Sequence, residues 1–154
     1  MRVLSNIFFA VIVISLVSAC QPRKPEHEIV SAVQQNNADF VAEYLSEGGD
    51  PNMLSRFKDP LLYLAVGRQG GVEVARLLVE AGADVNSQGK NGITALTGAA
   101  SWCNVDEIKL LLNAGADVNL AGKNKKTPIE SVCQTPVNRR ALTFNILLEA
   151  GAVR

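Results

Sequence analysis

The chain has 154 residues, in which 15 lysines and arginines balance 15 aspartates and glutamates. A neutral chain of this length suits one domain of ordinary size and has no global field that would attract nucleic acid or an anionic lipid surface. Electrostatic recognition must therefore be local, and the low aromatic content, 5% of the residues, leaves the core to Leu, Val, Ile and Ala.

Residues 1–19 have the pattern of a secretory signal peptide. After a positive start, the apolar run Ile7–Ala19 is shorter than the roughly 20 residues needed to cross a bilayer. The segment Val17-Ser18-Ala19-Cys20 resembles a bacterial lipobox, which implies a lipid on Cys20 at the start of the mature chain. The alternative is a plain signal peptide with an incidental thiol at Cys20. Gln21, rather than Asp, resembles outer-membrane sorting, so we expect a periplasmic protein anchored by lipid, with the outer membrane favoured.

Residues 20–27 are expected to form a polar tether, since they contain Pro22 and Pro25. At no more than about 3.5 Å per residue, residues 21–27 reach about 25 Å, which would keep the domain close to the membrane. It also holds His27, the single histidine of the chain. Because no second histidine and no Cys or carboxylate cluster stands at ligand spacing, we predict no metal site and no cofactor.

Residues 28–154 are built from a repeat. The segment Leu78–Asn86 recurs about 33 residues later as Leu111–Asn119, and related segments begin at Tyr44 and Leu147. A period of about 20–50 residues is typical of stacked supersecondary units, none of which buries its apolar face alone. The register divides the domain into four copies, residues 28–59, 60–93, 94–126 and 127–154.

Apolar spacing predicts two helices in each copy. In the first copy these cover residues 28–35 and 38–47, and in the third copy the capping-box pair Asn104 and Glu107 begins the second helix. In the fourth copy, Pro128 is expected in the first turn of a helix, and an enlarged loop follows over residues 134–140.

A turn and two helices in about 33 residues resemble the ankyrin repeat. Thr94–Ala100 and Thr127–Glu130 stand where that family has T-P-L-H-x-A-A, although the His is absent. The resemblance implies an all-α solenoid of about four repeats. It also implies β-hairpin-like fingers between repeats, which bind partners together with the inner helices.

The residues that repeat in register are interpreted as structural. Each second helix is expected to end in a left-handed glycine cap, at Gly48, Gly82, Gly115 and Gly151. The Asp-x-Asn pairs that follow should bond turn backbone, because catalytic carboxylates do not recur in every copy. The pairs are Asp50/Asn52, Asp84/Asn86 and Asp117/Asn119.

The fingers, expected at Met53–Asp59, Ser87–Ile93 and Leu120–Lys126, carry a basic stripe. The family alternates Lys with Asp here, whereas Gly89 and Gly122 occupy the usual acidic position. The stripe predicts a partner protein with an acidic surface or, more weakly, a phosphate-rich lipid; solvated turns that merely collect lysines are the alternative. The predicted binding residues are Arg56, Phe57, Lys58, Tyr63, Lys90, Asn91, Trp102, Lys123, Lys125 and Lys126.

Three of these residues, Phe57, Tyr63 and Trp102, are aromatic, and buried aromatics dominate interface energetics. Core packing is the alternative for Phe57 and Tyr63, and covering of a loop is the alternative for Trp102. Besides Cys20, the chain has Cys103 and Cys133, an even pair suited to an oxidising compartment. A bridge requires their Cα atoms within about 7 Å, so a disulfide and two free thiols are both open.

No catalytic constellation is recognisable. The sequence has no Gly-rich phosphate loop before a helix, no Ser or Cys nucleophile with a plausible His, and no paired carboxylates outside the register positions. The hypothesis is a non-enzymatic, protein-binding envelope lipoprotein that is a monomer when free and does not bind nucleic acid. Short bacterial ankyrin lipoproteins of this build resemble immunity proteins, which block secreted toxins such as type VI phospholipase effectors. The alternative is an envelope scaffold or stress-protection accessory that holds another periplasmic protein.

Overall fold

The computed structural model describes residues 26–67, 71–134 and 136–153. The predicted signal peptide, the lipidation site at Cys20 and the tether up to residue 25 lie outside these residues. Within them the helices pair along the chain. The pairs are α2 (Glu26–Gln34) with α3 (Ala38–Ser46), α4 (Leu61–Ala65) with α5 (Val72–Glu80), α6 (Ala95–Trp102) with α7 (Val105–Asn113), and the 3-10 turn η2 (Ile129–Ser131) with α8 (Val137–Glu149).

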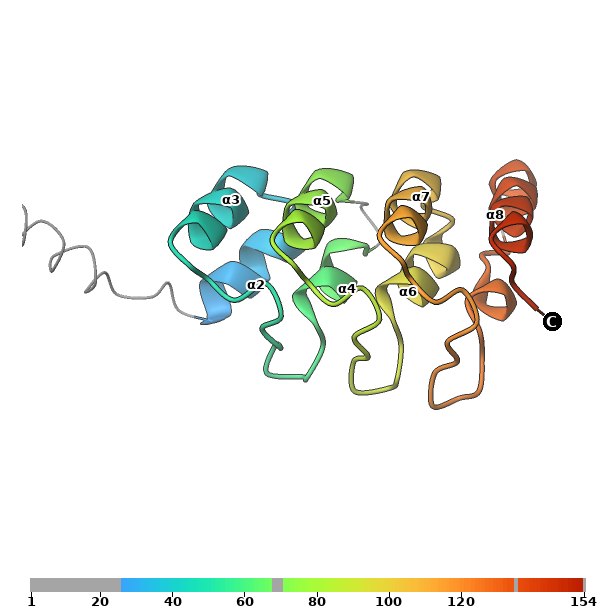
Figure 1. Ribbon diagram of the computed structural model, residues 1–154, viewed down its shortest axis with the longest axis horizontal. Coiled ribbons are helices and arrows are strands. Elements are labelled where there is room, and N and C mark those ends of the chain that lie inside the picture. The colour runs from blue at the N-terminus through green and yellow to red at the C-terminus, as the bar shows by residue number, and fades with distance from the viewer. Residues whose placement is uncertain (1–25, 68–70, 135, 154) are drawn as a thin grey trace, which may run out of the picture.

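The pairs stack side by side into a two-layered row (Figure 1). An outer row contains α3, α5, α7 and α8, an inner row contains α2, α4, α6 and η2, and three long loops project beyond the inner row. The described residues contain no β-strand, and the isolated β-bridge between Leu54 and Pro60 closes the base of the first loop. The predicted all-α solenoid is confirmed, and the three loops are the predicted fingers.

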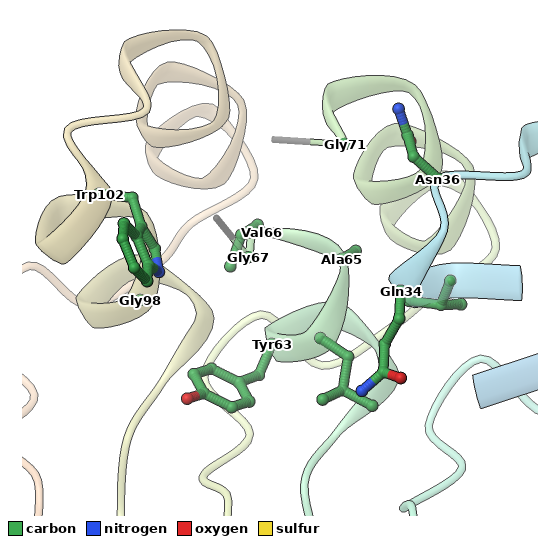
Figure 2. Close-up of a pocket in the computed structure, with 11 residues that line it drawn as sticks. Gln34, Asn36, Tyr63, Ala65, Val66, Gly67, Gly71, Gly98 and Trp102 are labelled. Atoms are coloured by element: carbon green, nitrogen blue, oxygen red, sulfur yellow. The ribbon is translucent and has the colours of Figure 1, made fainter. Parts of the chain in front are cut away.

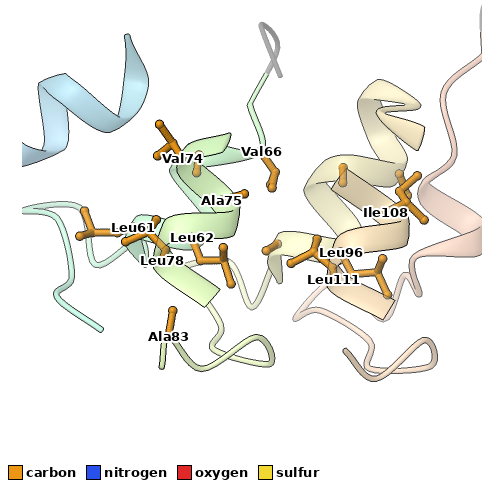
Figure 3. Packing of buried hydrophobic residues seen from close by; sticks show 14 of the residues in the cluster. Leu61, Leu62, Val66, Val74, Ala75, Leu78, Ala83, Leu96, Ile108 and Leu111 are labelled. Carbon is orange, nitrogen blue, oxygen red and sulfur yellow. The ribbon is translucent and has the colours of Figure 1, made fainter. Parts of the chain in front are cut away.

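The core runs through all four units and consists of aliphatic side chains. Leu62 and Leu78 are buried between α4 and α5, and Leu96 and Leu111 take the same positions one unit later (Figure 3). Burying each such side chain contributes about 1.5–3 kcal/mol. Small residues fill the remaining contact positions on the inner and outer helices, so the helices approach closely; among them are Ala65, Ala75, Ala95, Ala99 and Ala100.

The glycine after each outer helix has positive φ, as predicted: 82° at Gly48, 89° at Gly82, 88° at Gly115 and 92° at Gly151. A residue without a Cβ adopts this left-handed conformation at little cost. The chain then turns toward the finger through an Asx turn, in which Asp84 Oδ1 accepts the N–H of Asn86 at 2.9 Å. The same bond recurs at Asp50 and Asp117, both at 2.8 Å.

The asparagine of each Asp-x-Asn pair joins its own unit to the next. Asn52 Nδ2 donates to Gly82 O at 3.2 Å, and Asn52 Oδ1 accepts the N–H of Asp84 at 2.7 Å. Asn86 repeats both bonds to the third unit, and Asn119 repeats them to the fourth. The expectation of turn bonding therefore holds for the aspartates, while the asparagine amides fix the register between units.

Three local predictions were wrong. First, α2 begins at Glu26, two residues earlier than expected, so His27 lies in the helix and not in the tether. The carboxylates of Glu26 and Glu28 in its first turn favour this start, because they complement the helix dipole. Second, Asn104 makes no capping bond in its own helix; its Nδ2 donates instead to Gly67 O of the preceding unit at 3.1 Å.

The third wrong prediction concerns the fourth unit, where the first helix is reduced to the 3-10 turn η2. After Ser131, Val132 is extended, with φ −54° and ψ 136°, and Cys133 N–H donates to Ala100 O of the third unit at 3.1 Å. Pro136 then stands at the N-cap of α8, which begins at Val137, so Val137–Arg140 belong to a helix and not to the expected loop. The chain thus leaves its first helix early in order to pack against α6.

Candidate binding surface

The three fingers share one backbone path. In each finger a four-residue turn is closed by an N–H···O bond, from Lys58 to Ser55 at 2.7 Å, from Gly92 to Gly89 at 2.8 Å and from Lys125 to Gly122 at 2.9 Å. One further bond completes each hairpin, from the Ser55 N–H to Asp59 O at 2.9 Å, from the Gly89 N–H to Ile93 O at 3.0 Å and from the Gly122 N–H to Lys126 O at 3.1 Å. This is the three-residue hairpin in which a turn is followed by one left-handed residue, usually glycine.

Lysine occupies this left-handed position in two of the three fingers. The φ angles are 63° at Lys58, 70° at Gly92 and 60° at Lys125. For a residue with a Cβ, the conformation costs roughly 1–2 kcal/mol. Such backbone strain persists where the surrounding structure imposes it, and it concentrates at functional positions. Both lysines are exposed, so no buried contact of their side chains offsets the cost.

The fingers are also tied to one another. Lys123 N–H donates to Asn91 O at 3.2 Å, and Lys123 Nζ donates to Lys90 O at 2.6 Å. Gln88 Nε2 reaches Ala121 O at 3.2 Å in the same pair of fingers. Of the predicted stripe, Lys123 is therefore partly used for holding the second and third fingers together, and Asn91 contributes through its backbone carbonyl.

The predicted basic residues belong to the three fingers, which project side by side from the stack (Figure 1). The side chains of Arg56, Lys58, Lys90, Lys123, Lys125 and Lys126 are all exposed. Asp59 follows Lys58 directly, and its Oδ1 accepts the N–H of Lys90 from the second finger at 3.3 Å, while Glu130 lies near Lys126 beyond the third finger. The edge consequently presents several cations whose counter-charges are few.

The glycines that replace the usual acidic residues have a steric reason. A Cβ on Gly89 would lie 2.5 Å from Asp59 Oδ1, and a Cβ on Gly122 would lie 3.1 Å from Gly92 O. The fingers approach so closely at these positions that a side chain would separate them. Part of the basic character of the edge therefore follows from packing between fingers, a cause that sequence analysis missed because it depends on a contact about 30 residues away.

Beside the fingers, the inner helices form a hollow of about 340 Å³ (Figure 2). Tyr63 extends from α4 toward Gly98 and Trp102 of α6, and Gln34 and Asn36 border the opposite side. Gly98 allows this arrangement, because a Cβ there would lie 3.2 Å from Tyr63 Cε2. Burial raises the pKa of the Tyr63 phenol above its ordinary value, and the negative charge of Asp59 raises it further, so the hydroxyl is neutral at physiological pH.

Trp102 and Phe57 are the exposed aromatics of this side. Trp102 is 49% exposed, and Phe57 in the first finger is 58% exposed, with the Arg56 guanidinium 4.7 Å from the centre of its ring. Phe57 borders a second hollow, of about 590 Å³, together with Val30 and Leu64. Core packing is thus excluded for Phe57, whereas Tyr63 is half-buried between α4 and α6.

A third hollow, of about 440 Å³, lies between α6, η2 and the third finger. It shares Tyr63, Gly98 and Trp102 with the first hollow, and the first shares Gln34 and Leu64 with the second. The three hollows therefore adjoin one another along the inner helices, and together they are called the groove below. At its far end Glu130 accepts the Thr127 N–H at 2.9 Å and the Thr127 hydroxyl at 3.1 Å. These bonds, and the nearby Lys126, lower the pKa of Glu130 and keep it ionised.

The wall of the third hollow contains a disulfide. Cys103, at the end of α6, is bonded to Cys133, and their Cα atoms lie 5.6 Å apart. Cys103 adopts a left-handed conformation, with φ 53° and ψ 43°, and is almost fully buried. The bridge joins the shortened fourth unit to α6, directly after Trp102.

Within the described residues, no group of three His, Cys, Asp or Glu side chains is arranged to hold a metal ion. None of the helices in this part of the chain is long and apolar enough to cross a bilayer.

A family model for ankyrin repeats, in three copies, matches residues 29–152. This match covers all four helical units together with the groove and the fingers. No curated protein matches the chain.

Proposed function

This chain belongs to the ankyrin repeat family, whose members are typically non-enzymatic protein-binding scaffolds, and on that premise we propose that it is an envelope lipoprotein that binds and blocks a secreted toxin. The observation that carries the proposal is the edge formed by three basic fingers beside a groove with exposed Trp102 and Phe57. Such a surface combines aromatic anchors with a basic rim, the two features that make protein interfaces strong and selective.

The acidic-partner part of the proposal is supported by the charges at the fingertips. Lys58, Lys125 and Lys126 are exposed, and two of them occupy backbone positions where glycine would cost less. Turn geometry alone therefore does not account for lysine at these positions. A partner that places carboxylates against the finger edge would offset the strain with charge-assisted hydrogen bonds.

The envelope part of the proposal is supported by the sequence around Val17–Cys20, whose lipobox pattern implies a lipid on Cys20. Two acyl chains or more on one cysteine give a stable anchor, since each buried methylene contributes about 0.8 kcal/mol. A toxin that attacks the membrane from the periplasm, such as a phospholipase effector, would meet the protein at that surface. The toxin-blocking role itself rests on likeness to short ankyrin lipoproteins that act as immunity proteins.

Two experiments test the proposal. A strain that lacks this gene should be killed by sibling cells that carry an active type VI system, and expression of the wild-type chain should restore survival. In the contrary outcome, the deletion strain survives beside such siblings while a periplasmic protein co-purifies with the wild-type chain through the finger edge. These two results together would favour the scaffold or stress-protection role.

The finger edge is tested by Lys125→Glu/Lys126→Glu, which leaves the structural Lys123 in place. The matched control, Lys109→Glu/Arg139→Glu, makes the same charge change at exposed positions on outer helices. We expect the first variant to lose protection and the control to keep it. Equal protection by both variants would remove the finger edge from the mechanism. If the unlipidated domain instead binds anionic vesicles and salt strongly weakens that binding, lipid would be the ligand.

A further inference from the structure

The disulfide between Cys103 and Cys133 is unevenly exposed. Cys103 closes α6 and is 1% exposed, whereas Cys133 is only partly buried. Of the two cysteines, Cys133 alone lines the third hollow, the one of about 440 Å³ between α6, η2 and the third finger. A molecule in that hollow therefore meets the bridge from the Cys133 side.

The wall of this hollow is largely polar. The exposed Gln134 lies directly after Cys133, and the wall also contains Lys126 from the third finger and Glu130 from η2. Glu130 is ionised, so the two charges have opposite signs, and Tyr63, the other titratable group of the wall, is neutral. A small polar thiol is thus neither excluded by apolar packing nor repelled by a net charge.

We propose that Cys133 is a site of thiol–disulfide exchange, which takes a small water-soluble thiol from solution. The thiolate of the reagent attacks Cys133 Sγ, and the bond to Cys103 Sγ breaks. A mixed disulfide forms at Cys133, and Cys103 leaves as a thiolate that takes up a proton. A second molecule of the reagent then attacks the sulfur of the first, which frees Cys133 as a thiol and releases the reagent as its own disulfide. Two thiols thus supply the two electrons and two protons that reduce the bridge.

Burial selects the sulfur that is attacked, because exchange requires access to that sulfur. Cys103 lies between the end of α6 and the start of α7 at Val105, and it belongs to the core. Attack on Cys103 would require these two helices to separate. Cys133 follows the extended Val132 and packs at the outside of the same core, so it can be reached in the folded protein.

Opening the bridge is expected to loosen the end of α6. Cys103 is left-handed with φ 53°, as Asn36 is with φ 55° at the same point of the first unit. Asparagine adopts this conformation more readily than cysteine, so the bridge helps to hold Cys103 in it. Trp102 directly precedes Cys103 and lines the hollow. Exchange at Cys133 therefore alters the wall of the groove, while the fully buried Leu147 keeps α8 packed on the stack.

The inference goes beyond the proposed function and requires neither the lipid anchor nor a toxin. Its test uses the chain from residue 20 with Cys20→Ser, in which Cys103→Ala leaves Cys133 as the single thiol and Cys133→Ala leaves Cys103. Each variant is mixed with oxidised glutathione, and mass spectrometry follows the mixed disulfide. It should form at least about tenfold faster on Cys133 than on Cys103. Equal rates, or a faster reaction of Cys103, would overturn the proposal.

Urea provides the control for this comparison. In the unfolded chain the two cysteines should react at the same rate, because their access no longer differs. Circular dichroism without urea verifies that both variants are folded.

A second measurement leaves the bridge intact at the start. The Cys20→Ser chain is mixed with reduced glutathione, and the loss of the disulfide is followed by mass spectrometry. If the thiol enters the hollow of the folded protein, the rate should be proportional to the glutathione concentration and nearly independent of urea well below the unfolding transition. A rate that rises steeply from the first addition of urea would mean that the bridge reacts only after global unfolding, and the proposal would fail.

The route through the hollow is tested by charge. Lys126→Glu should slow the reduction by about threefold, because glutathione carries a net negative charge and Lys126 lines the hollow. Lys109→Glu makes the same change at an exposed position on α7 that does not line the hollow, and it should leave the rate unchanged. Equal rates in the two variants would exclude the hollow as the route.

Trp102, the single tryptophan of the chain, reports on the end of α6. Complete reduction should change its emission and increase its quenching by acrylamide. The variant Cys103→Ser/Cys133→Ser, treated with the same reductant, should show no change. An unaltered Trp102 signal after complete reduction would overturn the expected change in the groove.

Discussion

Replacing Lys125 by glycine separates the backbone cost of the third fingertip from its charge. Lys125 has φ 60°, and its counterpart in the second finger is Gly92 with φ 70°. The left-handed conformation costs lysine roughly 1–2 kcal/mol, which glycine avoids. Glycine in turn loses about 0.4–1 kcal/mol through its greater freedom in the unfolded chain. The net expectation is that Lys125→Gly is more stable by about 0.5–1 kcal/mol, or about 2–4 °C in the unfolding midpoint.

The assay is thermal unfolding followed by circular dichroism, with Lys125→Ala as the control. Alanine removes the same charge and the same long side chain but keeps the Cβ, so it should show no comparable gain. The reverse substitution, Gly92→Ala, should destabilise the domain, because its Cβ would lie 2.6 Å from Lys123 N in addition to the unfavourable φ. If Lys125→Gly is no more stable than Lys125→Ala, strain at the fingertip is not real and the argument for a functional lysine fails.

Three further substitutions test the contacts that hold the units together. Cys103→Ser/Cys133→Ser opens a loop of 30 residues, so the free energy of unfolding measured with urea should fall by about 3.5 kcal/mol in the chain-entropy model. Wild-type protein with reductant should lose a similar amount. No loss in either sample would exclude a stabilising bridge. Asn86→Ala breaks two bonds to the third unit and should cost about 1–3 kcal/mol in the same measurement, whereas a change within error would mean that water replaces the amide. Gly89→Ala should cost about 1–2 kcal/mol because its Cβ meets the Asp59 carboxylate, and most of that cost should vanish in a double variant with Asp59→Ser; additive effects would place the strain elsewhere.

The repeat register, the glycine caps and the fingers could be predicted from the sequence because they depend on contacts within one unit. Gly82 ends α5 as a left-handed cap, which depends on α5 alone. Alignment with Gly92 is enough to show that Lys125 stands at a position that favours glycine. Two of the three errors, at Asn104 and in the fourth unit, arose where a contact crosses units. Asn104 has the spacing of a capping residue, yet its amide reaches Gly67 O about 37 residues earlier, and no local pattern signals that bond.

The fourth unit illustrates the same limit on a larger scale. Its sequence from Thr127 to Ser131 satisfies the rules for a helix start, and the structure places only a 3-10 turn there. A longer helix does not form here because the segment makes contacts with α6 instead. These contacts are the hydrogen bond from the Cys133 N–H to Ala100 O and the disulfide to Cys103. The propensity of a few residues is worth some tenths of a kcal/mol each, whereas these tertiary contacts are worth several kcal/mol together. Tertiary structure therefore decides the conformation of this segment.

A physical criterion separates structural from functional polar residues in this stack. Polar side chains that repeat in register are engaged internally: Asn52, Asn86 and Asn119 each join two units. Fingertip side chains such as Lys58, Lys125 and Phe57 make no such bond in every unit and are exposed, and both lysines stand at a backbone position that favours glycine. In a repeat protein the scaffold needs the same bond in every unit, so a departure that carries a local cost has to be offset by something outside the scaffold. In this chain the departures place cations and aromatic rings on one edge. The partner is therefore expected to present a surface that is complementary to cations and aromatic rings.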